Sequence, residues 1–152
     1  MSETAGRTIY HNWRLGDWGY TSDLIAHDYM RRWILRTPWK IFRLHHILRG
    51  DADRHFHDHP MDFASLILVG GYVEYTPNNP PRVCYPGDVV RRKAEDLHFL
   101  KLRGTSAWTF LITGPYRRSW GFQTEDGWIA ASEYDDYLAK KRANGHAARV
   151  IR

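Results

Sequence analysis

Histidines recur at every second position in one short run of this sequence. The run spans residues 54–60 and reads RHFHDHP. Imidazole is the commonest neutral nitrogen ligand in proteins and suits zinc, iron, copper and nickel. Residues two apart in an extended chain point to the same side, so His57 and His59 can reach one ion. We predict these two histidines to be metal ligands; the alternative is a hydrogen-bonded pair of strand histidines.

Two later residues can complete such a site. His98 lies on a separate segment, after a Pro-Gly turn, and Asp62 follows the histidine run directly. Two or three histidines with one carboxylate leave coordination positions open for water, dioxygen or a substrate. We predict His98 and Asp62 to be further ligands. The alternatives are a core histidine with a protein partner and a carboxylate that accepts hydrogen bonds in the turn after Pro60.

Three neighbouring residues have other expected roles. His55 lies on the same side of the chain as His57 and His59, but three ligands from one strand would crowd a single ion. Its role depends on whether His57 and His59, or His55 and His57, are the ligand pair. Asp58 lies on the opposite side and is expected to support the site through a hydrogen bond. Glu74 is a rival carboxylate, and the preceding Gly70-Gly71 break leaves its direction open.

Residues 41–48 offer side chains for substrate binding. The segment is strand-like, so one of His45 and His46 must face inward. Arg43 has the parity of His45 and can contact an anionic substrate, or form an ion pair at a sheet edge. We predict Arg43, His45 and Tyr72 to line a substrate pocket, and we assign no catalytic residue.

The elements that must position these residues are mostly short strands. Gly and Pro turns separate the strand-like runs, without intervening helices, which favours a sandwich or barrel. Ser22 and Asp23 are candidate caps for a short N-terminal helix through residues 28–33, and Ser132 is a candidate cap for a C-terminal helix. We expect one domain over residues 1–152: an arm over about 1–38, a barrel over about 39–128 and the C-terminal helix over about 130–143.

Composition narrows the class of protein. The net charge of +5 is spread over short, separate basic pairs, so we expect a small-molecule substrate and not nucleic acid. Cys84 is the single cysteine, which fits a reducing cytoplasm. No signal-peptide pattern and no apolar run of about 20 residues is present, so we expect no membrane association.

The central third of the chain resembles the cupin superfamily. Its first motif is G-x5-H-x-H-x3,4-E-x6-G and its second is G-x5-P-x-G-x2-H-x3-N. Six residues between positions 50 and 98 stand for motif positions. Two spacings differ from the motif, the one from Gly50 to the histidine pair and the one from the Pro-Gly turn to His98. The motif Glu is absent from its place, and no Asn follows His98. The stretch over residues 57–74 also resembles small, uncharacterised cupin-like proteins of bacteria and phages. The six are Gly50, His57, His59, Gly70, Pro86 and His98.

This resemblance implies an all-β, cupin-type jelly-roll barrel (a double-stranded β-helix). It implies a metal-binding enzyme that acts on a small molecule with the help of a divalent ion. The first expectation is Fe(II) with oxygenase-type chemistry, and the other ions are zinc, nickel and manganese. One alternative is a metal-free isomerase or epimerase, in which His57 or His98 is the base and Tyr72 or Tyr75 the acid. The other is a non-catalytic binding or structural protein. Cupins commonly form homodimers, which we expect here as well.

Overall fold

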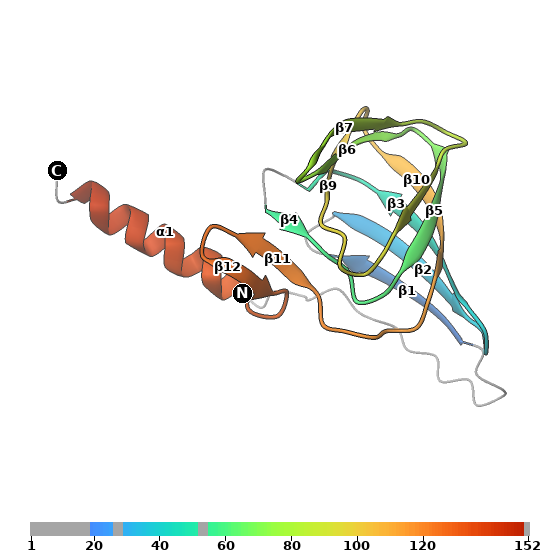
Figure 1. The fold of residues 1–152 in the computed structure, drawn as a ribbon, viewed down its shortest axis with the longest axis horizontal. Helices are drawn as coiled ribbons and strands as arrows, with labels where there is room; N and C mark the ends of the chain where they lie inside the picture. The colour runs from blue at the N-terminus through green and yellow to red at the C-terminus, as the bar shows by residue number, and fades with distance from the viewer. Residues whose placement is uncertain (1–18, 26–28, 52–54, 151–152) are drawn as a thin grey trace, which may run out of the picture.

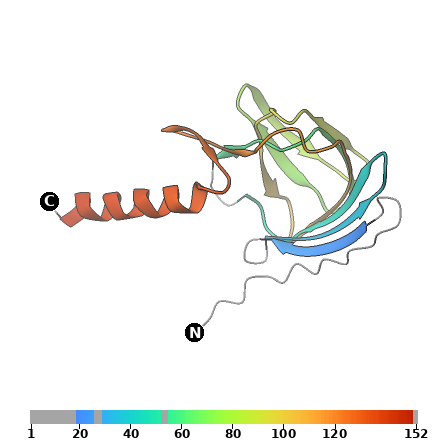
Figure 2. The ribbon, with the colours of Figure 1, turned by 90° about the horizontal axis from the view of Figure 1, so that it is seen from below.

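Twelve antiparallel strands and one helix make up the part of the chain that the structure, a computed structural model, describes: residues 19–25, 29–51 and 55–150. Six strands form the large sheet in the order β1-β2-β3-β10-β5-β8. It curves along its length, and the other strands lie across the interior from it (Figures 1 and 2). The strands of the large sheet are β1 (Gly19–Ile25), β2 (Met30–Arg36), β3 (Ile41–Ile47), β10 (Ala107–Thr113), β5 (Phe63–Val69) and β8 (Val89–Arg92).

Two three-stranded sheets complete the barrel. One has the order β12-β11-β4 and the other the order β7-β6-β9. β7 contains Pro80 and Pro81, yet it pairs with β6 on either side of them. The two prolines lie where the register shifts, between the pairs Glu74–Arg82 and Thr76–Asn79, at the sheet edge where a missing N–H is tolerated. These strands are β4 (Phe56–His57), β6 (Tyr72–Thr76), β7 (Asn79–Cys84), β9 (Phe99–Leu102), β11 (Gly121–Thr124) and β12 (Gly127–Ala130).

The expected N-terminal helix is wrong. Residues 30–36 are strand β2, which pairs along its whole length with β1 on one side and β3 on the other. Trp33, Ile34 and Leu35 are aromatic, β-branched and apolar residues that suit a pleated surface, and pairing outweighs the capping signal at Ser22 and Asp23. The barrel therefore begins within the stretch that we took for an arm, and strand pairing is described from Gly19 onward.

The large sheet has a mixed inner face and an apolar outer face. Directly paired residues share a face, so the register places Ile34, Arg43 and Leu111 in one inward row, and all three are buried. Beside this row, an apolar cluster fills one region of the interior. The next outward row runs Trp33, Leu44, Phe110, Leu66 and Val89 across five strands. The cluster consists of Ile47, Ile67, Tyr72, Cys84, Val90, Leu100 and Ala107.

The C-terminal helix is confirmed, with shifted bounds. α1 (Tyr134–Val150) begins two residues beyond Ser132 and carries Asp135 and Asp136 in its first turn, where the helix dipole favours acidic side chains. Its first half is anchored: Tyr134 is buried and stacks on Phe122 of β11, and Lys141 pairs with Glu125 and Asp126 in the turn between β11 and β12. The rest projects away from the barrel (Figure 2). Across the described residues, no helix has the length and apolar character needed to cross a membrane.

Candidate functional site

Backbone pairing places two of the predicted ligands opposite each other. The N–H of His57 donates to the carbonyl oxygen of His98 at 2.9 Å, and the N–H of His98 donates back at 3.0 Å. Residues paired in this way project their side chains from the same face. The imidazoles of His57 and His98 therefore point the same way, although the residues are far apart in sequence.

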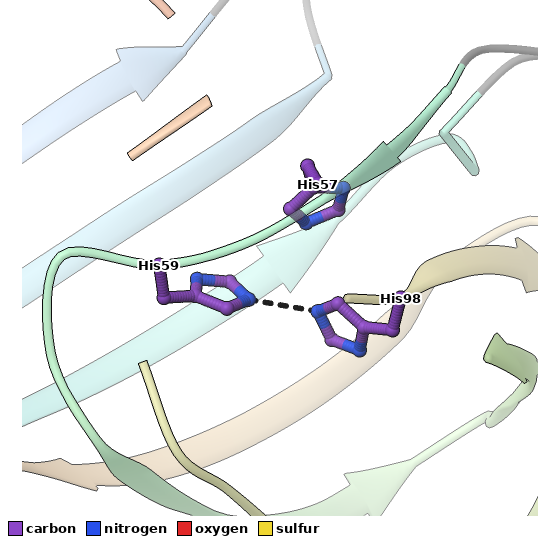
Figure 3. A group of neighbouring side chains, drawn as sticks. All are labelled: His57, His59 and His98. Carbon is purple, nitrogen blue, oxygen red and sulfur yellow. Dashed lines mark hydrogen bonds between the residues drawn. The ribbon is translucent and has the colours of Figure 1, made fainter. Parts of the chain in front are cut away.

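His59 joins them from the segment after β4. Its own N–H donates to the carbonyl oxygen of Ala94 at 2.9 Å, which keeps the chain extended beyond His57. The Nε2 atoms of His59 and His98 lie 2.8 Å apart (Figure 3). One ligand nitrogen from each of the three histidines lies within 4.8 Å of the other two. The structure thus brings His57, His59 and His98 together in a group that can bind a metal ion; that they do so stays a prediction.

The group is electrostatically suited to a cation. Burial, and next the neighbouring His98, lowers the pKa of His57 to about 4. The same two causes, with the charge of His57, hold the pKa of His59 well below its usual value. Both imidazoles are therefore neutral at physiological pH, which is the form that binds metals.

Glu74 fixes the direction of His98. Its carboxylate is 1% exposed; Oε1 lies 2.7 Å from Nδ1 of His98, and Arg92 donates to both oxygens. Burial raises the pKa of Glu74, but the hydrogen bond and charge of His98, with the charge of Arg92, lower it further than burial raises it. The ionised carboxylate needs a proton on Nδ1, which leaves the lone pair of His98 on Nε2, toward the other histidines.

Asp51 holds a similar position behind His57. Its Oδ2 accepts the N–H of Leu100 at 2.7 Å and lies 3.9 Å from Nδ1 of His57. The hydroxyl of Tyr29 donates to the other oxygen. The carboxylates of Asp51 and Glu74 thus lie against the Nδ1 side of two different histidines, and neither is in the group of candidate ligand atoms.

Asp58 supports the segment from the opposite side, as predicted. It is 3% exposed and accepts from the N–H of Gly121 at 2.7 Å, from Trp128 Nε1 at 2.9 Å and from Arg118 at 2.6 Å. These bonds tie the histidine segment to β11 and β12. The carboxylate therefore positions His57 and His59 through the backbone between them.

The structure does not bring Asp62 or His55 to the group, which corrects the prediction for Asp62. Its carboxylate accepts from the N–H of Ala94 and from Arg117, both at 2.7 Å, and is about half exposed. The turn-acceptor alternative therefore describes it better, because the chain turns at Pro60 and directs the side chain outward. His55 contacts Tyr134 at the start of α1 and Glu125 in the turn between β11 and β12 instead.

An aromatic ring lies where the carboxylate was expected. The ring of Phe63 packs 4.8 Å from that of His59 and 6.2 Å from that of His98, between centroids. The sequence held a signal for this position: Phe63 is the fourth residue after His59 and lies six intervening residues before Gly70, the spacing of the motif Glu. The described site therefore has three imidazole nitrogens and no carboxylate among its candidate ligands.

The predicted substrate residues divide between two regions. Arg43 and His45 face the interior from β3, whereas His46 stacks on Trp108 at 4.2 Å on the outer face. Arg43 is 2% exposed, so the edge ion pair that we had allowed for it is wrong. Tyr72 lies in the apolar cluster, because its pairing with Cys84 and Leu102 places it there.

Comparison with known proteins identifies the fold. No family model matches the sequence, and no curated protein matches it either. A cupin-2 domain protein of Rhodospirillum rubrum is similar in structure with a TM-score of 0.54 and 13% identity, over 99% of this chain and 90% of that one.

Two further proteins of known structure are similar over part of their length. The DMSP lyase DddQ of Ruegeria pomeroyi DSS-3 has a TM-score of 0.52 and 19% identity, over 81% of this chain and 62% of its own. AerE of Microcystis aeruginosa has a TM-score of 0.52 and 14% identity, over 76% of this chain and 54% of its own. The chain thus spans less than two thirds of either protein, and identities this low show the fold alone. Together with the all-β topology, they show that this chain has the fold of the cupin superfamily.

Proposed function

We propose that this protein is a metal-dependent enzyme that acts on a small molecule inside the barrel. The observation that carries the proposal is the convergence of three imidazoles, with Glu74 behind His98 in the arrangement that orients metal-binding histidines in other proteins. Structural similarity to a DMSP lyase supports an enzyme role for this fold, though not a particular reaction. We assign the site to Fe(II), with zinc, nickel and manganese as the competing ions.

The residues of the chain have distinct tasks in this proposal. His57, His59 and His98 hold the ion, and the ring of Phe63 covers one side of the group. Three protein ligands leave positions open, at which a bound ion supplies Lewis-acid or dioxygen chemistry. Because the Nε2 atoms of His59 and His98 lie 2.8 Å apart, the proton between them must leave or move to Nδ1 of His59 before both nitrogens can bind.

Metal titration of the untagged protein tests the proposal. We expect one Fe(II) per chain under anaerobic conditions, measured by competition with a chelator, and no stoichiometric binding by His98→Ala. Glu74→Gln keeps the shape of the side chain but removes its charge, and we expect about 10- to 100-fold weaker binding. His46→Ala is the matched control, since His46 lies on the outer face. A protein that takes up no metal, or equal losses in the control, would overturn the proposal.

Separate assays identify the ion and the class of reaction. Protein loaded in turn with Fe(II), Zn, Ni or Mn is given small organic acids in air, with oxygen uptake as one readout and product formation without oxygen uptake as the other. Oxygen uptake with Fe(II) alone supports oxygenase-type chemistry. Turnover with several of the ions and no oxygen uptake supports Lewis-acid catalysis of elimination, isomerisation or hydrolysis instead.

One observation favours a second candidate, a metal-free isomerase or epimerase. His98 backed by buried Glu74 also has the arrangement of a general base with its orienting carboxylate. The acids that we considered do not fit well, because Tyr72 lies in the apolar cluster and Tyr75 stacks on Phe99, 4.5 Å away. Incorporation of solvent deuterium into small carbonyl compounds that survives exhaustive chelation would favour this candidate.

A third class, a non-catalytic binding or structural protein, has its own signature. Metal binding would then raise thermal stability, and His57→Ala would lose both together, while every assay above stays silent. We further infer a reducing cytoplasm, since Cys84 is a free, buried thiol, and no role in nucleic-acid binding. A change in mobility of labelled DNA or RNA that weakens with salt would contradict the last inference.

A further inference from the structure

The inner face of β3 carries two polar side chains in the middle of the large sheet. Arg43 pairs with Ile34 of β2 and Leu111 of β10, and His45 pairs with Arg32 and Thr109 of the same two strands. With a strand on either side, β3 has no free edge. Its inward side chains must therefore find their partners inside the barrel.

The guanidinium of Arg43 lacks a charged partner there. It is 2% exposed; Nη2 donates to the hydroxyl of Tyr116 at 3.0 Å, and the guanidinium carbon lies 5.6 Å from the centre of that ring. Its Nε is buried without a hydrogen-bond partner, and no carboxylate of the described residues pairs with it. Burial lowers the pKa of Arg43, and the Tyr116 bond only opposes this. An unpaired buried charge costs several kcal/mol, roughly, so proteins rarely keep one without a use.

His45 has a second polar atom in need of a partner. Its Nε2 is buried and makes no hydrogen bond within the described part of the chain. Arg43 and His45 lie two residues apart on one strand, so their side chains project into the same part of the interior. A guanidinium N–H and an imidazole nitrogen that donates in its Nε2–H tautomer thus lie without partners on one inward face, which points to a ligand with oxygen acceptors.

This face lies next to the histidine group in the register of the large sheet. Arg43 shares an inward row with Leu111 and Ser65, and Ser65 lies two residues from Phe63, whose ring packs against that of His59. A small molecule held by Arg43 and His45 can therefore extend toward the proposed ion.

We propose that Arg43, His45 and Tyr116 form a subsite for the carboxylate of a small organic acid, the substrate class of the enzyme proposed above. The guanidinium supplies a full positive charge and a donor on Nε, the imidazole supplies a donor on Nε2, and the Tyr116 hydroxyl closes the third side. Carboxylates suit guanidinium groups in shape and charge. A single unpaired cation balances a monoanion, which favours a carboxylate over a phosphate dianion.

The inference rests on the proposed metal enzyme for its role, but its test does not need the metal. Acetate, acetamide and inorganic phosphate are titrated into metal-free and metal-loaded protein, with the Nε–H signal of Arg43 in an NMR spectrum and calorimetry as readouts. We expect acetate to shift that signal in both forms, acetamide to have no effect and phosphate to bind more weakly. Arg43→Met should weaken acetate binding at least about tenfold, the loss of roughly one charge-assisted hydrogen bond.

Two further variants keep the test independent of folding. Tyr116→Phe removes only a hydroxyl from a half-exposed ring, so the protein should still fold. Because Arg43 loses a hydrogen-bond partner, we expect weaker acetate binding with a modest loss of stability. Arg91→Met is the matched control, since Arg91 is exposed on β8 and its loss removes the same charge. Equal binding of acetate and acetamide, or equal losses in Arg43→Met and Arg91→Met, would overturn the subsite. Acetate binding by a protein that takes up no metal would leave the subsite standing and refute the proposed metal enzyme instead.

Discussion

Protonation of His45 should destabilise the fold in mild acid. Burial first, and next the charges of Arg32 and Arg43, lowers the pKa of His45 from 6.5 to about 3. In the unfolded chain the imidazole takes up a proton below about pH 6.5, whereas in the folded protein it stays neutral down to about pH 3. The unfolded state binds more protons in this window, so stability is complete above pH 6.5 and falls as the pH falls.

The size of the effect follows from the width of that window. Between pH 6.5 and pH 5 the unfolded state gains about 1.4 kcal/mol per pH unit, which makes about 2 kcal/mol from this residue alone. The variant His45→Leu removes the titrating group. We therefore expect the difference in unfolding free energy between variant and wild type to move by about 2 kcal/mol in favour of the variant on going from pH 7 to pH 5.

Urea unfolding of the metal-free protein at the two pH values measures this change. Ile34→Val is the matched control, since Ile34 is buried on the neighbouring strand and does not titrate, so its destabilisation should be equal at both values. A variant-to-wild-type difference that is the same at pH 7 and pH 5 would show that His45 is not held neutral by burial. The electrostatic account of the interior would then be wrong.

Three further outcomes are expected. Asp58→Ala leaves the donors of three other residues without their acceptor and should cost about 3 kcal/mol in urea unfolding, against a small change for the exposed carboxylate in Asp62→Ala. Phe63→Glu places an anionic ligand beside the histidines and should tighten metal binding in a chelator competition; unchanged or weaker binding would contradict the place given to this ring. The apolar outer row predicts a homodimer, and Phe110→Glu should convert it to a monomer in sedimentation; a wild type that is monomeric at every concentration refutes this.

Local patterns in the sequence were enough to find much of the site. The alternation of side chains along an extended chain separates His57 and His59 from Asp58, and the structure shows that separation. The same rule requires one of His45 and His46 to face inward, and His45 does. Inferences of this kind succeed because the period of a strand is a property of the backbone and needs no knowledge of its partners.

Residues whose placement depends on distant pairing were misjudged. The direction of Glu74 could not be read past Gly70 and Gly71, whose φ angles of 77° and 135° turn the chain from the large sheet into a small one. The helix expected through residues 28–33 was wrong because capping residues are a local signal. The pairing of residues 30–36 with a strand on either side is not local and could not be read from the sequence. The alternative for Arg43, an ion pair at a sheet edge, was suggested by its charge alone, yet Arg43 lies on a central strand.

The charge balance of the site links its two unusual features. A divalent ion bound by His57, His59 and His98 would receive no negative charge from its protein ligands, since Phe63 lies where a carboxylate was expected. Arg43 adds a further positive charge to the same interior. Glu74 is already shared between His98 and Arg92, and Asp51 lies behind His57. The interior is thus short of negative charge once an ion is bound, and an anionic substrate is the group that restores the balance. Substrate and ion should therefore each bind more tightly in the presence of the other, a coupling that titration of acetate with and without metal measures directly.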